Sequence, residues 1–111
     1  MLLLLDESLP HDLAFVIPEV DVRTVRQMGW ESIGNGELVR RAEAAGFDVF
    51  LMADRNLEYQ QNLSRVGVGI LVLLARSNRL EHLRPLVPDI LAALATVRPG
   101  TVSKVGPGVR G

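Results

Sequence analysis

Two short apolar runs that end abruptly in carboxylates constrain the fold of this chain more than any other feature. The run Leu2–Leu5 is followed by Asp6 and Glu7, and residues 48–53 run into Asp54. Apolar runs this short are typical of strands that are buried on both faces of a parallel sheet. Ligands of open α/β sheets bind beyond the carboxyl ends of the strands. If the two strands are parallel neighbours, we expect the three carboxylates to converge at one edge of the sheet.

Strand-like and helix-like segments alternate along the rest of the chain. Apolar patterning predicts three more strands, over residues 20–25, 66–74 and 101–105. Apolar residues at helical spacing and capping signals predict helices after Ser8 and Pro10, over residues 35–45, near 79–84 and over about 86–96. Ser8 and Asn35 are the expected N-caps of the first two helices, and Gly46 is the expected stop of the second. In the first of these helices, Leu13, Val16 and Phe15 are expected to face inward.

This alternation predicts one three-layer, Rossmann-like α/β domain over residues 1–105. Its mainly parallel sheet of four to five strands is expected in the order 2-1-3-4, with the fifth strand beyond the fourth and right-handed crossovers. Residues 106–111 are expected to form a disordered tail.

Composition and charge indicate the number of domains, the kinds of metal site that are possible and the cellular compartment. The 111 residues are 48% hydrophobic with a net charge of −1, so one domain has enough apolar side chains for a core and shows no global basic field for nucleic acid. A nuclease with a local basic patch stays compatible with this balance. Without cysteine there are no disulfides and no cysteine zinc sites. The leucine run is too short to span a membrane and lacks the basic flank of a signal peptide, so we expect a cytoplasmic protein without membrane contact.

Clustered carboxylates repel one another unless a cation compensates their charge. Mg²⁺ and Mn²⁺ prefer oxygen ligands, and Asp6, Glu7 and Asp54 are candidates for such a site. Glu37, in the first turn of the helix over residues 35–45, and the side-chain carbonyl of Asn56 are two further candidates. Each of the last two also has a structural interpretation, because the helix dipole favours Glu37 there and Asn56 can cap a turn. Glu7 can equally point to solvent.

Arginines follow the third and fourth predicted strands. Arg55, Arg76 and Arg79 are placed to contact substrate phosphates at the same sheet edge, with ordinary solvated arginine as the competing interpretation. The two histidines, His11 and His82, have no partner at metal-ligand spacing and are expected to be solvated. No serine stands in a nucleophile-elbow pattern, which argues against acyl transfer.

Several motifs resemble one known family. Residues 2–10 resemble the opening signature LLLDENLP of small bacterial and archaeal PIN-like proteins. Residues 53–57 are similar to a later motif of that family, after its third strand, and residues 35–38 occupy the place of its acidic helix residue. Residues 59–63 and 75–80 also resemble one bacterial subset of the group, so the resemblance covers nearly the whole chain.

The resemblance implies a PIN-like fold and metal-dependent ribonuclease activity of the toxin–antitoxin type. It assigns Asp6, Glu37 and Asp54 as catalytic residues that hold Mg²⁺ or Mn²⁺ with help from Asn56, and it implies RNA as substrate. A small antitoxin-type protein encoded nearby is the implied partner, and a homodimer stays open. The chain departs from the family pattern at Ala53, Arg55 and Asn56, so a catalytically degenerate interaction module is one alternative.

A receiver-like phosphoacceptor domain is the other alternative. It would use Asp54 as the phosphorylated residue, with Asp6 and Glu7 beside it. It also needs a hydroxyl after the fourth strand, where Ser77 stands, and a lysine after the fifth strand, where Lys104 stands.

Overall fold

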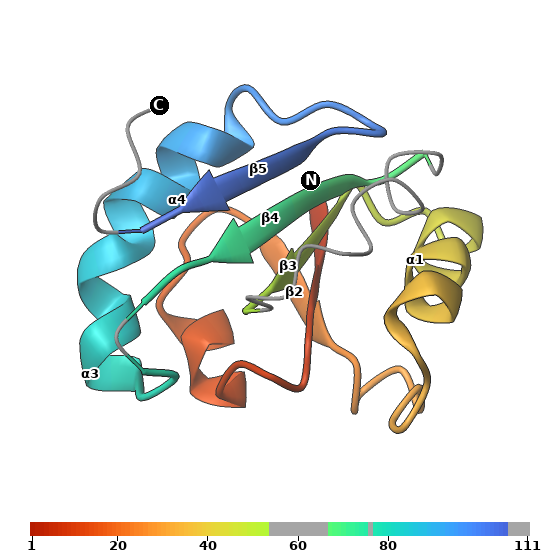
Figure 1. Cartoon of the computed structure of the whole chain (residues 1–111), viewed down its shortest axis with the longest axis horizontal. Helices are drawn as coiled ribbons and strands as arrows, with labels where there is room; N and C mark the ends of the chain where they lie inside the picture. The colour runs from red at the N-terminus through yellow and green to blue at the C-terminus, as the bar shows by residue number, and fades with distance from the viewer. Residues whose placement is uncertain (54–66, 76, 107–111) are drawn as a thin grey trace.

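The computed structural model of the chain describes residues 1–53, 67–75 and 77–106. These residues form a five-stranded parallel sheet in the order β2-β1-β3-β4-β5, with helices on both faces (Figure 1). The strands are β1 (Leu2–Leu5), β2 (Asp21–Thr24), β3 (Val49–Met52), β4 (Gly69–Leu73) and β5 (Val102–Val105). The predicted fold class and strand order are confirmed. Of the predicted tail only Gly106 is described, and residues 107–111 lie outside the described residues.

The described helices are short. They are η1 (His11–Phe15), α1 (Asn35–Ala44), α3 (Leu80–Leu83), η3 (Arg84–Leu86) and α4 (Val87–Leu94). The segment after Pro10 is a 3₁₀ helix, in which residues three apart share a face. Leu13 is therefore buried and Val16 packs beside it, whereas Phe15 is 82% exposed. The prediction that Phe15 faces inward is wrong because the helix has a period of three residues.

The core lies in two layers, one on each face of the sheet. Successive side chains of a strand point to opposite faces, so Leu3 and Leu5 pack toward η1, α3 and α4, while Leu4 packs toward α1. Every residue of β3 and β4 is buried. This double burial explains why the central strands are apolar runs without alternation.

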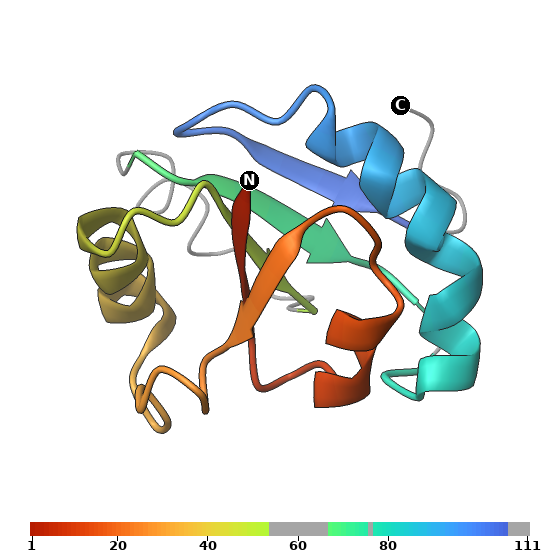
Figure 2. The ribbon, with the colours of Figure 1, turned by 180° about the vertical axis from the view of Figure 1, so that it is seen from behind.

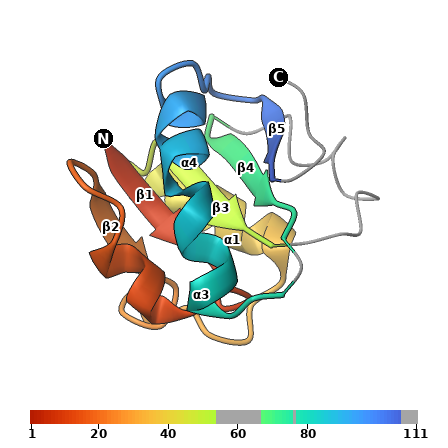
Figure 3. The same ribbon diagram turned by 90° about the vertical axis from the view of Figure 1, so that its left-hand side faces the viewer.

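One crossover departs from the right-handed rule. The helices η1 and α4 cover the same face of the sheet, yet the connections β1→β2 and β4→β5 run in opposite directions across it. Two such crossovers on one face must have opposite hands, and Figure 3 shows that β4→β5, through α3 and α4, is the left-handed one. The prediction of right-handed crossovers is wrong for this connection. The single 3₁₀ helix η1 is too short to cover that face alone, and Ile90 and Leu94 of α4 complete the layer.

The helix α1 covers the other face and begins at the carboxyl edge of the sheet, because it runs back after β2 (Figure 2). Its N-cap is Gly34 rather than the expected Asn35, and Gly46, at a φ of +88°, follows its end as predicted. In the loop before it, Trp30 packs edge-to-face on Phe47, with ring centroids 6.1 Å apart. Trp30 thus anchors the loop on the core.

Candidate functional site

The carboxyl ends of β1 and β3 lie side by side. The two strands pair in parallel, with Leu3 opposite Val49, and the amide of Asp6 donates to the carbonyl of Leu51 at 3.0 Å. Strand order reverses here, since β2 lies on one side of β1 and β3 on the other. Such a switch point is where open α/β sheets bind ligands. Asp6 therefore occupies the predicted place.

Asp6 begins the turn that leaves β1. It is half-buried, and its Oδ2 accepts a hydrogen bond from the amide of Ser8 at 3.1 Å. The amide of Leu9 donates to the Asp6 carbonyl at 3.1 Å and closes the turn. An aspartate that bonds the amide two residues on forms an Asx-turn. This turn orients the Asp6 carboxylate at the sheet edge.

Ser8 ties three segments of the edge together. Its Oγ accepts a hydrogen bond from the amide of Ala53 at 3.1 Å, and its carbonyl accepts one from Nδ2 of Asn78 at 2.6 Å. The prediction that Ser8 caps the following helix is wrong, because Pro10 is the N-cap and the Ser8 hydroxyl reaches across to β3 instead. Nothing in the local sequence distinguishes a capping serine from one that bonds 45 residues away.

The turn after β4 holds a second polar pair that the sequence did not indicate. The hydroxyl of Ser77 lies 2.5 Å from Nδ1 of His82, and it accepts a hydrogen bond from the amide of Arg79 at 3.2 Å. His82 is half-buried, so the prediction of a solvated histidine is wrong for this residue. The contacts hold the first turn of α3 against the loop, which is a structural role.

The remaining charged candidates differ in their surroundings. Glu37 lies in the first turn of α1 and pairs with Nε of Arg40 at 3.3 Å and of Arg41 at 3.4 Å. Arg79 pairs with Glu81 at 3.1 Å, and both side chains are mostly exposed. These pairs are local, since their partners lie two to four residues apart in the sequence. Asp54, Arg55, Asn56 and Arg76 lie outside the described residues.

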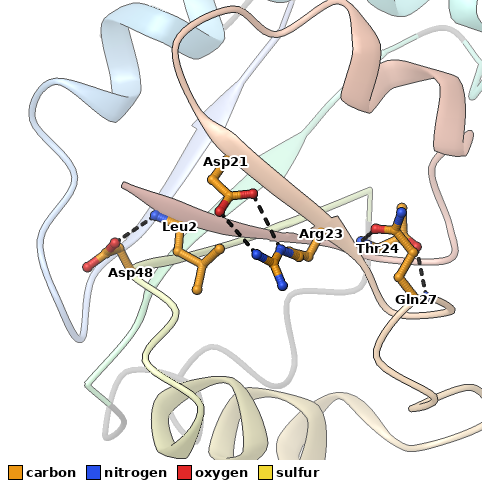
Figure 4. A network of polar contacts seen from close by, with 6 residues as sticks. All are labelled: Leu2, Asp21, Arg23, Thr24, Gln27 and Asp48. Carbon is orange, nitrogen blue, oxygen red and sulfur yellow. Dashed lines mark hydrogen bonds and ion pairs between the residues drawn. The ribbon is translucent and has the colours of Figure 1, made fainter.

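A groove of about 1000 Å³ opens beside Asp6, between η1 and β2. Glu7 is exposed and lines this groove together with Asp6. Thr24, at the end of β2, and Gln27 also line the groove. The Thr24 amide donates a hydrogen bond to the Gln27 side-chain carbonyl at 2.9 Å, and the Gln27 amide donates one to the Thr24 hydroxyl at 3.0 Å (Figure 4). This reciprocal pair fixes the turn after β2 and so the shape of the groove.

At this sheet edge the described residues present one half-buried carboxylate, that of Asp6. Within residues 1–53, 67–75 and 77–106, no three Asp, Glu or His side chains are grouped to hold an ion. The half-buried carboxylate of Asp6 fits one oxygen ligand of Mg²⁺ or Mn²⁺, ions that are bound in proteins by one or two carboxylates plus water. Two further predicted ligands, Asp54 and Asn56, follow Ala53 in the sequence and lie outside the described residues.

A comparison with protein-family models, with curated proteins and with solved structures finds no match for this chain. None of the helices in the described part of the chain has the length and apolar character needed to cross a membrane.

Proposed function

We propose that this protein is a metal-dependent ribonuclease of the PIN-like type, acting where β1 and β3 end. The observation that supports it is the adjacency of these two strands at the point where strand order reverses, with Asp6 at the end of one and Asp54 after the other. We propose further that it is the toxin component of a toxin–antitoxin pair, with a small antitoxin-type protein as partner. The motifs that resemble the family support this part.

In this proposal Asp6 and Asp54 hold Mg²⁺ or Mn²⁺, with Glu37 and Asn56 as further ligands. The bound ion would lower the pKa of a water molecule and offset charge that develops on the phosphodiester. The described residues of the chain orient the Asp6 carboxylate. The amide of Ser8 holds Asp6 at Oδ2, which leaves Oδ1 without a hydrogen bond among the described residues.

The substrate phosphates would be held by Arg55, Arg76 and Arg79. Arg79 pairs with Glu81, but their side chains are 75% and 60% exposed. Exposed ion pairs contribute about 0–1 kcal/mol, so the guanidinium can exchange this partner for a phosphate at little cost.

The receiver-like alternative ranks lower. The strand order 2-1-3-4-5 is shared with receiver domains and favours it. However, Lys104 lies within β5, opposite Val72, rather than beyond its end, and Ser77 is engaged with His82. The left-handed crossover also places α4 on the face opposite the one that right-handed winding requires.

A catalytically degenerate interaction module is the third candidate. It is favoured by the departures from the family pattern at Ala53, Arg55 and Asn56. Metal binding separates it from the two catalytic candidates, because a ligand that binds only the native state raises the thermal midpoint.

The deciding experiment combines three assays on the full chain and on Asp54→Asn. We expect millimolar Mn²⁺ to raise the thermal midpoint of the wild type and single-stranded RNA to be cleaved slowly, with both effects lost in Asp54→Asn. Phosphorylation of Asp54 by a small phosphodonor, without RNA cleavage, would instead identify a receiver. No midpoint shift, no cleavage and no phosphorylation would leave the interaction module. Asp48→Asn is the matched control, since Asp48 lies at the opposite end of β3.

A further inference from the structure

The groove between η1 and β2 has an apolar wall with one prominent ring. Phe15 is 82% exposed. Among the described residues, Phe15 and Met1 are the only large apolar side chains that are exposed. Other apolar side chains line the same groove: Leu9, Pro10, Ala14, Val20 and Val22. Phe15 and these side chains line one groove, and a continuous apolar surface of this kind is typical of an interaction site.

The charges of the groove are mostly negative. Its lining carries four carboxylates, those of Asp6, Glu7, Asp21 and Glu31, against the single guanidinium of Arg26. Arg23, which lies on β2 outside the lining, pairs with Asp21 at 3.4 Å. Without a bound metal ion, this balance repels phosphates and anionic lipids and attracts cationic side chains.

The groove also follows an edge of the sheet. Among the described residues, β2 is the last strand on its side and has no further strand paired to it. Val22 and Thr24 of β2 line the groove. An extended segment of another chain can lie along such an edge, with its apolar side chains in the groove.

We propose that this groove binds a basic, amphipathic segment of a partner protein. Its apolar side chains would pack on Phe15, and its arginine or lysine side chains would lie against Glu7 and Glu31. The proposal stands on the shape and charge of the groove and not on the ribonuclease proposal. Because Asp6 belongs to both sites, an occupied groove would also restrict access to the candidate metal site.

The test uses the full chain without metal and three labelled synthetic peptides of equal length. One alternates arginine with leucine, one glutamate with leucine and one arginine with serine. We expect the arginine–leucine peptide to bind about tenfold more tightly than either of the others, because it alone matches both charge and apolar surface. Equal binding of the arginine–leucine and arginine–serine peptides would overturn the proposal.

Location is tested with Phe15→Ser and Glu31→Lys. The first should weaken binding of the arginine–leucine peptide about tenfold and the second about fivefold. Both side chains are exposed, so the thermal midpoint should stay unchanged. The matched control is Glu43→Lys on α1, on the opposite face, and equal weakening by this control would show nonspecific attraction and overturn the proposal.

Two other occupants would also be revealed. Metal-independent binding of single-stranded RNA that Phe15→Ser weakens would assign the groove to nucleic acid. Concentration-dependent dimerisation in sedimentation that Phe15→Ser abolishes would assign it to a second copy of this chain. Either result overturns the partner proposal. If the full chain binds the arginine–leucine peptide but does not cleave RNA, only the proposed ribonuclease activity is contradicted.

Discussion

An aspartate lies beside each end of β1: Asp48, which precedes β3, at the amino end, and Asp6 at the carboxyl end. Their side chains have different partners. At the amino end, Oδ2 of Asp48 accepts a hydrogen bond from the amide of Leu2 at 2.8 Å and so links two strands (Figure 4). At the carboxyl end, the Asp6 side chain bonds the amide of Ser8 within its own turn, and the hydroxyl of Ser8 makes the side-chain link to the residue after β3. At this edge the neutral side chain of Ser8, rather than a carboxylate, makes the hydrogen bond between the two segments. The carboxylate is left at the sheet edge, where a cation can bind it.

The largest effect should separate the two aspartates by activity. Under the proposed function, Asp6→Asn removes a metal ligand and should lower single-turnover cleavage of RNA with Mn²⁺ about 1000-fold, which corresponds to about 4 kcal/mol of activation free energy. Asp48→Asn should leave the rate unchanged. An equal fall in the cleavage rate of both variants would show that the position of Asp6 at the carboxyl edge of the sheet has no special role in cleavage.

The second effect concerns Ser8, which should be more important for stability than either aspartate. Ser8→Ala leaves the partly buried amide of Ala53 without its acceptor, so the free energy of unfolding should fall by about 2 kcal/mol. Urea denaturation measures it. In Asp6→Asn the same free energy should stay level or rise, because a carboxylate is removed from an acidic edge. A fall as large as that of Ser8→Ala would make Asp6 structural.

The third effect tests Glu37, whose carboxylate has only local partners. Under the proposed function, Glu37→Gln should slow RNA cleavage about tenfold, or about 1.4 kcal/mol. Its ion pairs with Arg40 and Arg41 are exposed, so stability should change by less than about 0.5 kcal/mol. An unchanged cleavage rate would remove Glu37 from the site.

The smallest effect concerns the amino end of β1. Asp48→Ala removes the bond to the amide of Leu2, which lies near solvent, so the free energy of unfolding should fall by about 1 kcal/mol. For a domain of about this size, that lowers the thermal midpoint by about 4–8 °C. Asp12→Ala is the control, because the pair of Asp12 with His11 is exposed and should contribute little. No fall would mean that water replaces the carboxylate fully.

The sequence alone determined the sheet. Strands buried on both faces need apolar residues at every position, so Leu3 of β1 and Phe50 of β3 could be recognised without coordinates. Glycine at a positive φ ends a helix for local reasons, which made the stop at Gly46 predictable. The placement of Asp6 beside β3 followed from the same strands.

Only the tertiary structure showed which side chains outside the strands are exposed and which residues they contact. Spacing could not show that Phe15 lies outside, because that depends on a 3₁₀ period, nor that His82 bonds Ser77. The left-handed crossover to β5 places α4 beside η1 on one face of the sheet, an arrangement that no local pattern in the sequence indicates. Local patterns determine which residues share a face of an element. The contacts across that face depend on segments far apart in the sequence, as in the bond from Ala53 to Ser8.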